Sequence, residues 1–317
     1  MLGRVHKIES KDYYVFSGEK NIVRCSLRGI FKKEYSLKKD KQYKLDIVAV
    51  GDVVELETNA DGTGVIYNIH KRKNYLSRKA PRIKGASYRG ERLEQIIASN
   101  LDNIFIVASV KNPKFNNRLI DRIIVAAESS HIAVHIIINK TDLDKKRDYK
   151  GWVDIYNSLG YEVIPTNKFS DEGIEKILTA AEGKTNIFWG MSGVGKSTIL
   201  NRVYPQLNLK IGDIGEKSGK GQHTTVTAVM NLINANTAVI DTPGIREIDP
   251  YGITQENLGH YFVEFEEFIN ECRFNSCTHN HEPGCAVQDA FNDNLITEER
   301  FESYLNMLDS IEDDMIF

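Results

Sequence analysis

The sequence has 317 residues, of which 41% are hydrophobic and 27% are charged. These values are typical of globular proteins and exclude collagen-like, low-complexity and wholly disordered chains. At roughly 100 to 200 residues per domain, the length indicates two or three domains. No apolar run approaches the ~18 residues of a membrane span, and the first residues lack the apolar core of a signal peptide. We therefore expect a cytoplasmic protein without membrane contact.

The charge is distributed unevenly along the chain, although the net charge is only −3. Residues 1–94 carry 21 Lys and Arg against 12 Asp and Glu, a net charge of +9. Residues 251–317 carry 2 against 15, a net charge of −13. A basic N-terminal part is typical of a surface that meets nucleic acid, and a merely solvated basic face is the alternative.

Residues 1–75 predict an all-β barrel, because short apolar runs alternate there with glycine-marked turns. The spacing favours a small antiparallel barrel, either an OB-fold or, as the main alternative, an SH3-like barrel. The segment 32–44 interleaves lysines with Tyr35 and Tyr43, a mixture that can follow RNA phosphates and stack on bases, and a disordered, solvated loop is the equal alternative. Cys25, in one of the apolar runs, is expected to be an unreactive core thiol.

Residues 76–94 are polar and contain glycine, which predicts a linker. The pattern changes at residue 95, where β-rich apolar runs begin to alternate with helix-length segments up to residue 248. The runs fall at 103–110, 133–139, 161–166 and 186–190. Such alternation predicts an α/β domain with a parallel sheet covered by helices on both faces.

Residues 249–317 predict a mainly helical domain, with helices at 257–268 and 297–314. In the second helix, apolar residues recur at helical spacing and are expected in the core: Phe301, Tyr304, Leu305, Leu308 and Ile311. A domain this short has little core of its own, so a structural metal ion would stabilise it.

The segment 190–197, GMSGVGKS, fits the phosphate-binding pattern G-x-x-x-x-G-K-[ST] and follows an apolar run. Its glycines let backbone N–H groups surround phosphate oxygens, and the next helix directs its positive end toward them. We expect Lys196 to contact the β- and γ-phosphates as a catalytic cation and Ser197 to bind Mg²⁺. The expected nucleotide contacts are Gly190, Met191, Ser192, Gly193, Val194, Gly195, Lys196, Ser197 and Thr198.

A second motif, DTPG at 241–244, ends a short apolar run. Asp241 is expected to hold Mg²⁺ through water, and the amide of Gly244 to meet the γ-phosphate. The polar stretch between the two motifs is typical of a switch segment, in which Thr224 or Thr225 could reach Mg²⁺.

A third motif, NKTD at 139–142, predicts that the base is guanine. A carboxylate such as Asp142 accepts hydrogen bonds from the N1–H and the exocyclic amine of guanine, and adenine offers no matching pair. Together with Asn139, Lys140 and Thr141 it indicates GTP. This guanine loop precedes the phosphate loop, the reverse of the order in ordinary small GTPases, so the domain is predicted to be circularly permuted.

Three of the four cysteines lie close together in the pattern Cys272-x₄-Cys277-x-His279-x₅-Cys285. Three thiolates and one imidazole form a closed tetrahedral site suited to structural Zn²⁺. Spacing alone leaves His281 as an alternative to His279.

The permuted motifs, flanked by a basic barrel and a Cys/His cluster, resemble the RsgA (YjeQ) family of GTPases that depend on the small ribosomal subunit. Segments such as SLRGIF, VAVGDVVELE, RKNYLSR and QIIASNLDNIFIVAS carry the resemblance along the whole chain. It implies an OB-fold, a permuted GTPase domain, a zinc domain and a role in late maturation of that subunit. The implied partners are the small subunit, its rRNA, GTP and GDP, and the protein is expected to be a monomer.

The resemblance also implies residue roles. It selects His279 as the fourth zinc ligand. Ile245 stands where many GTPases have a water-orienting Gln, and His223 matches the family histidine proposed to position that water. A loop histidine without a catalytic role is the alternative for His223. Thr166 and Asn167 stand where the family has the loop that backs the guanine ring. A permuted GTPase for another RNA, such as a large-subunit precursor, and a GTP-gated scaffold are the two alternative functions.

Overall fold

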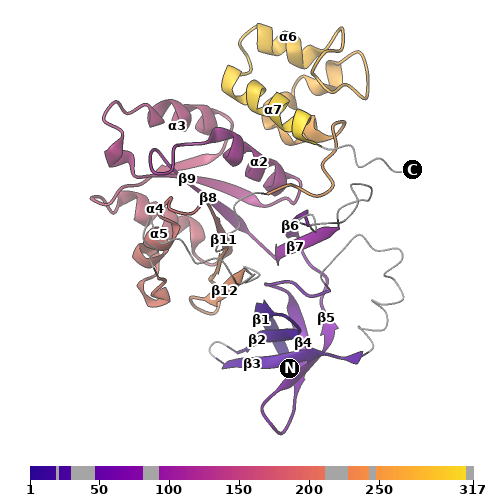
Figure 1. Ribbon diagram of the computed structural model, residues 1–317, viewed down its shortest axis with the longest axis vertical. Coiled ribbons are helices and arrows are strands. Elements are labelled where there is room, and N and C mark those ends of the chain that lie inside the picture. The colour runs from indigo at the N-terminus through magenta and orange to yellow at the C-terminus, as the bar shows by residue number, and fades with distance from the viewer. Residues whose placement is uncertain (19–20, 30–46, 81–92, 211–227, 243–247, 312–317) are drawn as a thin grey trace, which may run out of the picture.

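The computed structural model describes residues 1–18, 21–29, 47–80, 93–210, 228–242 and 248–311. A barrel lies at one end of the molecule, a helical C-terminal part lies at the other, and a sheet with helices lies between them (Figure 1). No helix in these ranges combines the length and the apolar character that a membrane crossing requires.

The N-terminal barrel has five strands: β1 (Leu2–Glu9), β2 (Asp12–Ser17), β3 (Asn21–Leu27), β4 (Val53–Thr58) and β5 (Gly64–Ile69). They close in the order β1-β2-β3-β5-β4, with β3 and β5 parallel and the other pairs antiparallel. A closed five-stranded barrel of this order confirms the OB-fold and not the SH3-like alternative. Alternate residues of β3 fill its core, and burial raises the pKa of the Cys25 thiol to about 11. The segment 32–44 lies outside the described residues.

The expected linker is not structureless at its ends. Strands β6 (Tyr75–Lys79) and β7 (Glu94–Ser99) pair with each other as an antiparallel ribbon. The ribbon is attached on two sides, because Ser99 N–H donates to the carbonyl of Val50 at 2.9 Å and Lys79 N–H donates to that of Asp249 at 2.7 Å. The polar, glycine-containing composition predicted a linker without strands, and this is wrong for the two ends, which form β6 and β7 because their backbone groups pair with each other. Residues 81–92 are not among those described, and the boundaries between the domains stay predictions.

The central sheet has six strands in the order β10-β9-β8-β11-β13-β12. Their bounds are β8 (Asn103–Ser109), β9 (Ala133–Asn139), β10 (Glu162–Pro165), β11 (Thr185–Trp189), β12 (Val229–Leu232) and β13 (Ala238–Asp241). All pairs are parallel except β12 with β13, so the expected purely parallel sheet is corrected to a mixed one. The connection at 233–237 is a tight turn, in which Asn234 Oδ1 accepts from Thr237 N–H at 2.8 Å, and so short a turn joins only antiparallel strands.

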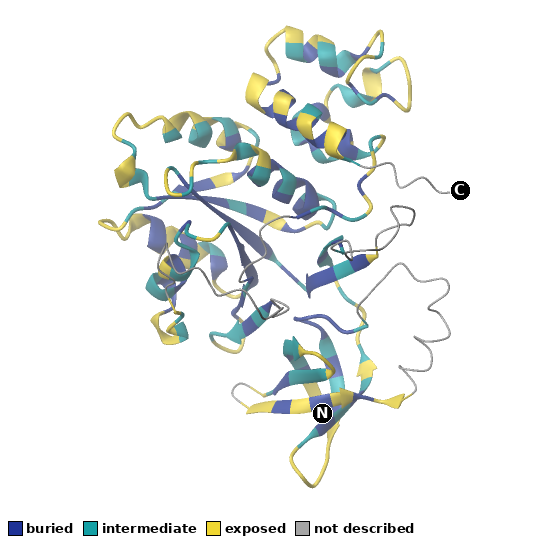
Figure 2. Cartoon of the chain, viewed as in Figure 1, coloured by how far each residue is buried: buried dark blue, intermediate teal, exposed yellow. Residues whose placement is uncertain are grey.

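Helices cover both faces of this sheet, as the sequence predicts. They are α2 (Asn117–Glu128), α3 (Tyr149–Ser158), α4 (Glu172–Ala181) and α5 (Lys196–Val203), with short 3₁₀ turns η2 (Thr141–Leu143) and η3 (Pro205–Leu207). One apolar cluster packs under α2 and α3, and a second packs under α4 and α5. The strands between them are buried along most of their length, and every residue of β8 is buried (Figure 2).

The C-terminal part contains the 3₁₀ turns η4 (Leu258–Tyr261), η5 (Val263–Phe265) and η6 (Ile269–Glu271) and the helices α6 (Ala286–Asn292) and α7 (Glu298–Ser310). The single helix expected at 257–268 is wrong, because Phe262 adopts an extended conformation (φ −102°, ψ 100°) that separates η4 from η5. The expected second helix is confirmed as α7, although it ends at Ser310 and not at residue 314. Of its expected core residues, Phe301, Tyr304 and Leu308 are buried, and Leu305 and Ile311 are partly buried against the same cluster.

Both end parts contact the central domain. β1 of the barrel lies along β12, where the ring Nδ1 of His6 hydrogen-bonds the carbonyl of Met230. Arg4 donates to Thr185 Oγ1 at 3.0 Å. On the opposite side, α7 packs against α2.

Candidate nucleotide site and metal centre

Four loops that carry the predicted nucleotide residues follow the carboxyl ends of neighbouring parallel strands. Asn139 ends β9, Thr166 follows β10, Gly190 follows β11, and Asp241 ends β13. In open α/β sheets the ligand binds at this edge. The fold thus brings the guanine loop, the phosphate loop and the first two residues of the DTPG motif, Asp241 and Thr242, to one edge of the sheet.

The phosphate loop needs its glycines for two physical reasons. Gly193 and Gly195 have φ angles of +82° and +98°, which residues with a side chain rarely adopt. Gly190 and Gly195 also lie against other groups, since a Cβ would come within 2.5 Å of the Val107 carbonyl oxygen at Gly190 and 2.3 Å of Asn139 Nδ2 at Gly195. The loop leads directly into α5, whose first turn contains Lys196, Ser197 and Thr198.

Lys196 connects the phosphate loop to the DTPG segment. Its ammonium nitrogen lies 3.2 Å from Asp241 Oδ1 and donates to the carbonyl of Thr242 at 2.9 Å. Thr242 Oγ1 in turn donates to the carbonyl of Phe188 in β11 at 2.8 Å. The cation expected at the phosphates and the carboxylate expected at Mg²⁺ therefore lie side by side.

The guanine loop is bonded to the phosphate loop. Asn139 is buried, and its Nδ2 donates to the carbonyl of Val194 at 2.8 Å. Lys140 Nζ donates to the carbonyl of Gly193 at 2.6 Å and also contacts that of Asn112. Desolvation lowers the pKa of Lys140, and the nearby Asp142 opposes this shift. Asp142 itself is exposed in η2, where a base can reach it.

The loop after β10 joins the same network. Thr166 Oγ1 donates to Asn139 Oδ1 at 2.9 Å, and the Thr166 carbonyl accepts from both the N–H and the hydroxyl of Thr141 at 3.2 Å. Asn167 instead uses its side chain within its own loop, accepting from Phe169 N–H at 2.7 Å. Its carbonyl accepts from Arg202 of α5 at 2.6 Å. Arg202 and Asn112 were missed from the sequence, because neither belongs to a motif.

The donor set at the phosphate loop fits Mg²⁺. The ion prefers oxygen ligands, and Ser197 and Asp241 supply a hydroxyl and a carboxylate at this edge. Asp241 Oδ1 is buried and accepts no hydrogen bond from the described residues, so only the Lys196 ammonium balances it. The other residues expected at the phosphates and the ion, His223, Thr224, Thr225 and Gly244, lie outside the described residues, as does Ile245.

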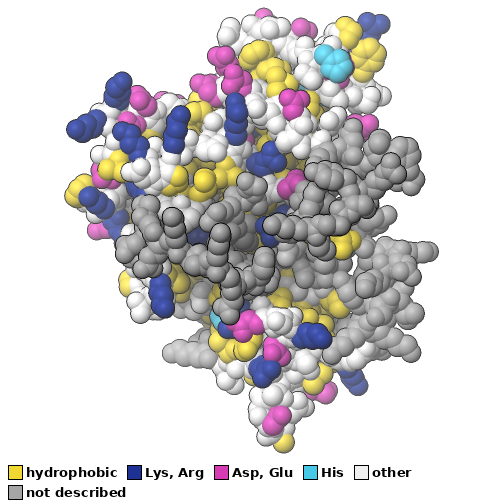
Figure 3. Space-filling model, viewed as in Figure 1, with side chains coloured by type: hydrophobic (Ala, Val, Ile, Leu, Met, Phe, Trp, Pro, Cys, Tyr) yellow, Lys and Arg dark blue, Asp and Glu magenta, His cyan; other side chains and the backbone are white. Residues whose placement is uncertain are grey.

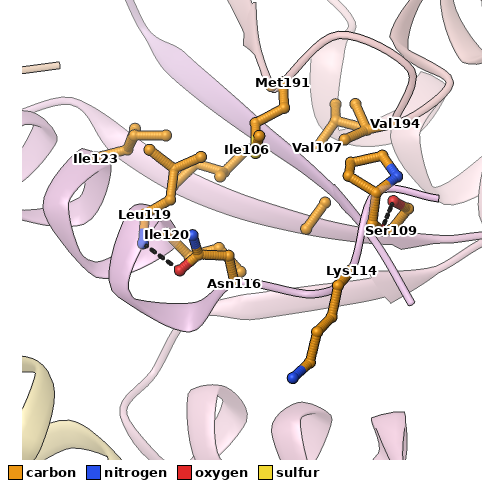
Figure 4. A pocket seen from close by; sticks show the side chains of 13 residues that line it. Ile106, Val107, Ser109, Lys114, Asn116, Leu119, Ile120, Ile123, Met191 and Val194 are labelled. Carbon is orange, nitrogen blue, oxygen red and sulfur yellow. Dashed lines mark hydrogen bonds between the residues drawn. The ribbon is translucent and has the colours of Figure 1, made fainter. Parts of the chain in front are cut away.

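A small apolar cavity of about 20 Å³ lies beneath the phosphate loop (Figure 4). Met191 and Val194 line one side of it, and Leu119 and Ile123 of α2 line another. Helix α2 begins beside it, with Asn116 Oδ1 accepting from Leu119 N–H at 3.2 Å. The cavity is too small for a nucleotide, since it has room for about one water molecule. It marks where α2 supports the phosphate loop.

The predicted zinc ligands converge. The ligand atoms of Cys272, Cys277, His279 and Cys285 all lie within 4.8 Å of one another. His279 presents Nδ1, which lies 3.4 Å from Cys285 Sγ and 3.6 Å from Cys272 Sγ. Burial raises the pKa of the Cys277 thiol to about 12, so a cation is needed to keep the thiolate form. His281, the alternative ligand, is exposed.

Residues that surround this cluster were not found from the sequence. Glu282 accepts from Thr278 N–H at 2.8 Å, from Thr278 Oγ1 at 2.6 Å and from Asn280 N–H at 3.1 Å. Although burial opposes ionisation, these hydrogen bonds lower the pKa of Glu282 to about 2. The carboxylate therefore fixes the turn that carries His279. Such local turn chemistry gives no distinct pattern in a sequence.

Gly259 of η4 sets the position of the His279 ring, because a Cβ there would lie 2.9 Å from both Nε2 and Cδ2 of the imidazole. We expect a Gly259→Ala variant to release zinc to a chromogenic chelator about tenfold faster than the wild type, since residues around the ligands control metal affinity. Gly151→Ala is the matched control, because Gly151 lies in α3 and a Cβ there would meet no atom within 4 Å. Equal release rates for Gly259→Ala and wild type would show that the ring is not held by this contact.

Known proteins are similar to this chain over nearly its whole length. A family model described as RsgA GTPase matches residues 69–251, and one described as RsgA N-terminal domain matches residues 2–66. The chain is 35% identical over 316 residues to the small ribosomal subunit biogenesis GTPase RsgA of Phocaeicola vulgatus, with 99% of this chain and 98% of the relative covered. It is 37% identical over 317 residues to the protein of the same name from Chlorobaculum parvum, with 98% of each covered.

Two solved structures agree with these matches. The crystal structure of YjeQ from Thermotoga maritima covers 97% of this chain and 96% of its own, with a TM-score of 0.71 at 30% identity. The structure of YloQ, a circularly permuted GTPase, covers 100% of this chain and 96% of its own, with a TM-score of 0.70 at 26% identity. The chain therefore belongs to the RsgA family of circularly permuted GTPases, which hydrolyse GTP.

Proposed function

We propose that this protein hydrolyses GTP to GDP and phosphate during late maturation of the small ribosomal subunit, and that the subunit stimulates the hydrolysis. The observation that carries the proposal is the junction of the nucleotide loops, with Lys196 3.2 Å from Asp241 and Asn139 bonded to Val194 at 2.8 Å. The names of the curated relatives, small ribosomal subunit biogenesis GTPases, support the choice of partner.

In the proposed mechanism, the backbone of residues 190–198 surrounds the phosphates, and Asp142 selects guanine. Lys196 stabilises the charge that develops on the γ-phosphate oxygens. Ser197, Asp241 and a switch threonine, Thr225, would hold Mg²⁺, which neutralises phosphate charge when bound.

His223 would position the attacking water, and Gly244 would meet the γ-phosphate. Thr166 and Asn167 would back the guanine ring, and the link from Thr166 to Asn139 supports this for Thr166.

The proposal also covers the partners. The basic barrel, within the N-terminal segment of net charge +9, would bind rRNA in a salt-dependent manner. One structural Zn²⁺ per chain, held by Cys272, Cys277, His279 and Cys285, would stabilise the C-terminal part. The protein would act as a cytoplasmic monomer.

The test is phosphate release by the purified protein from GTP and from ATP, with and without small subunits, at two salt concentrations. We expect release from GTP only, an increase of at least about tenfold with subunits, and a smaller increase at high salt because phosphate contacts weaken. Equal turnover with and without subunits would contradict subunit stimulation. A larger effect of large-subunit precursors would favour the alternative RNA.

A His223→Ala variant, tested for phosphate release and for subunit release in cells, separates an enzyme from a GTP-gated scaffold. In a His223→Ala variant, turnover is expected to fall while GTP binding persists, since the imidazole would act on water and not on the nucleotide. The readout that decides is subunit release in cells. Unchanged release with lost turnover would favour the scaffold.

A further inference from the structure

The loop between the first two zinc ligands lines a hollow on the surface of the C-terminal part. The hollow has a volume of about 660 Å³, and its walls include Thr254, Glu256, Asn257, Arg273, Phe274 and Asn275. Phe274 is 43% exposed there. A large aromatic side chain exposed beside a hollow is a candidate contact for a partner.

Arg273 is unusual in its surroundings. Of the two basic residues among 251–317, Arg300 is buried with 1% of its surface exposed, so Arg273 is the one that faces outward. Acidic side chains predominate over this part on the face shown in Figure 3. Yet the guanidinium of Arg273 forms no ion pair within the described residues, and it lies instead over the ring of Phe274, 5.4 Å from its centre. A cation and an aromatic face are thus both available.

The fold holds this pair in place. Arg273 N–H donates to the carbonyl of Gly284 at 3.0 Å, and a Cβ at Gly284 would lie 3.3 Å from Arg273 Cβ. The carbonyl of Phe274 accepts from Cys277 N–H at 3.2 Å. Because Cys272 and Cys277 belong to the metal cluster, the loop between them is anchored at both ends.

We propose that this hollow binds an unpaired nucleotide of RNA, with its base against Phe274 and its phosphate at Arg273. The proposal rests on the proposed function and names the contact that the C-terminal part makes there. Aromatic rings stack on unpaired bases, arginine pairs with phosphate, and Glu256 offers an acceptor to an exocyclic amine. The surrounding acidic residues disfavour a duplex, which presents many phosphates. Arg273 disfavours a basic peptide.

The experiment measures binding of the full-length, zinc-loaded protein to small subunits and to protein-free small-subunit rRNA, with a non-hydrolysable GTP analogue. We expect Phe274→Ala to weaken binding to both about tenfold, and Phe274→Trp to retain it, because either ring can stack. Arg273→Ala is expected to reduce the slope of log affinity against log salt by about 1.

Leu295→Ala is the control, because Leu295 is 65% exposed and lies outside the hollow. Zinc content and subunit-free GTP turnover should stay at wild-type values in all four variants.

A second measurement uses Phe274→Trp, whose fluorescence is expected to be quenched by a single-stranded oligoribonucleotide in excess of the quenching of wild-type protein. Wild-type affinity in Phe274→Ala would overturn the proposal, and so would weaker binding to subunits with unchanged binding to protein-free rRNA, which would indicate a ribosomal protein. If wild-type protein does not bind subunits at all, the proposed function fails, while the fluorescence measurement still decides whether the hollow takes a base.

Discussion

A Lys196→Met variant is expected to lose GTP hydrolysis by at least about 10²-fold in kcat/KM, because it removes the cation that we propose to contact the phosphates. No other side chain is expected to supply this charge, because the position of the Lys196 ammonium is fixed by its contacts. Its ammonium lies between Asp241 at 3.2 Å and the Thr242 carbonyl at 2.9 Å, on the first residue of α5. The measurement is phosphate release over a range of GTP concentrations, together with binding of a fluorescent GDP analogue.

The matched control for this variant is Lys176→Met. Lys176 lies on α4, and its ammonium pairs with Glu172 one helical turn away at 3.0 Å on the exposed surface. Exposed pairs of this kind contribute about 0.3–0.5 kcal/mol, so turnover and stability should remain close to wild type. Wild-type hydrolysis in Lys196→Met would mean that the phosphate loop does not act in catalysis, whatever its sequence.

The sequence predicted the nucleotide loops because each has a local chemical requirement. Phosphate binding needs glycines at fixed spacing, and the structure gives the reason at Gly190 and Gly195, where a Cβ would collide with neighbouring groups. The contacts between loops were not predictable in this way. Arg202 supports the Asn167 loop from α5, and Asn112 contacts Lys140, through pairings that only the packed sheet edge creates.

The errors in the fold have a common physical cause. Residues 76–94 read as a linker, yet their ends pair as β6 and β7, and residues 257–268 read as one helix but form separate short turns. In both segments local composition was a weak guide, since backbone pairing and the aromatic packing around Phe262 and Phe265 decide the conformation. The parallel strands were easier to predict because burial on both faces leaves continuous apolar runs.

Arg300 shows most clearly what a sequence conceals. It stands in the first turn of α7 beside glutamates, a pattern typical of an exposed helix face, but it is fully buried. Its guanidinium pairs with Asp121 of α2 and with Glu264 of η5, where Nε lies 2.6 Å from Oε1. Tyr156 also donates to Asp121, at 2.8 Å. Although burial opposes it, the two carboxylates raise the pKa of Arg300 above its usual value.

Replacing Arg300 by Met is therefore expected to lower the free energy of unfolding by about 3–5 kcal/mol, because Asp121 and Glu264 would remain as buried charges without a partner. The measurement is urea denaturation followed by tryptophan fluorescence and by zinc release. Arg118→Met is the control, since Arg118 is exposed on the same helix α2 and lies 4.0 Å from Glu302 of α7.

The three buried charges allow a sharper test. In the triple variant Arg300→Met, Asp121→Leu and Glu264→Leu the buried charges are gone, so much of the lost stability should return. Asp121 Oδ2 accepts no hydrogen bond in the described part of the chain, so this group of three buried charges is incompletely satisfied, which favours recovery of stability. Asp121 belongs to α2, and Leu119 and Ile123 of this helix line the cavity beneath the phosphate loop. The Arg300→Met variant should therefore also change the rate of GDP release. A stability loss below about 1 kcal/mol in Arg300→Met would contradict the buried-charge argument.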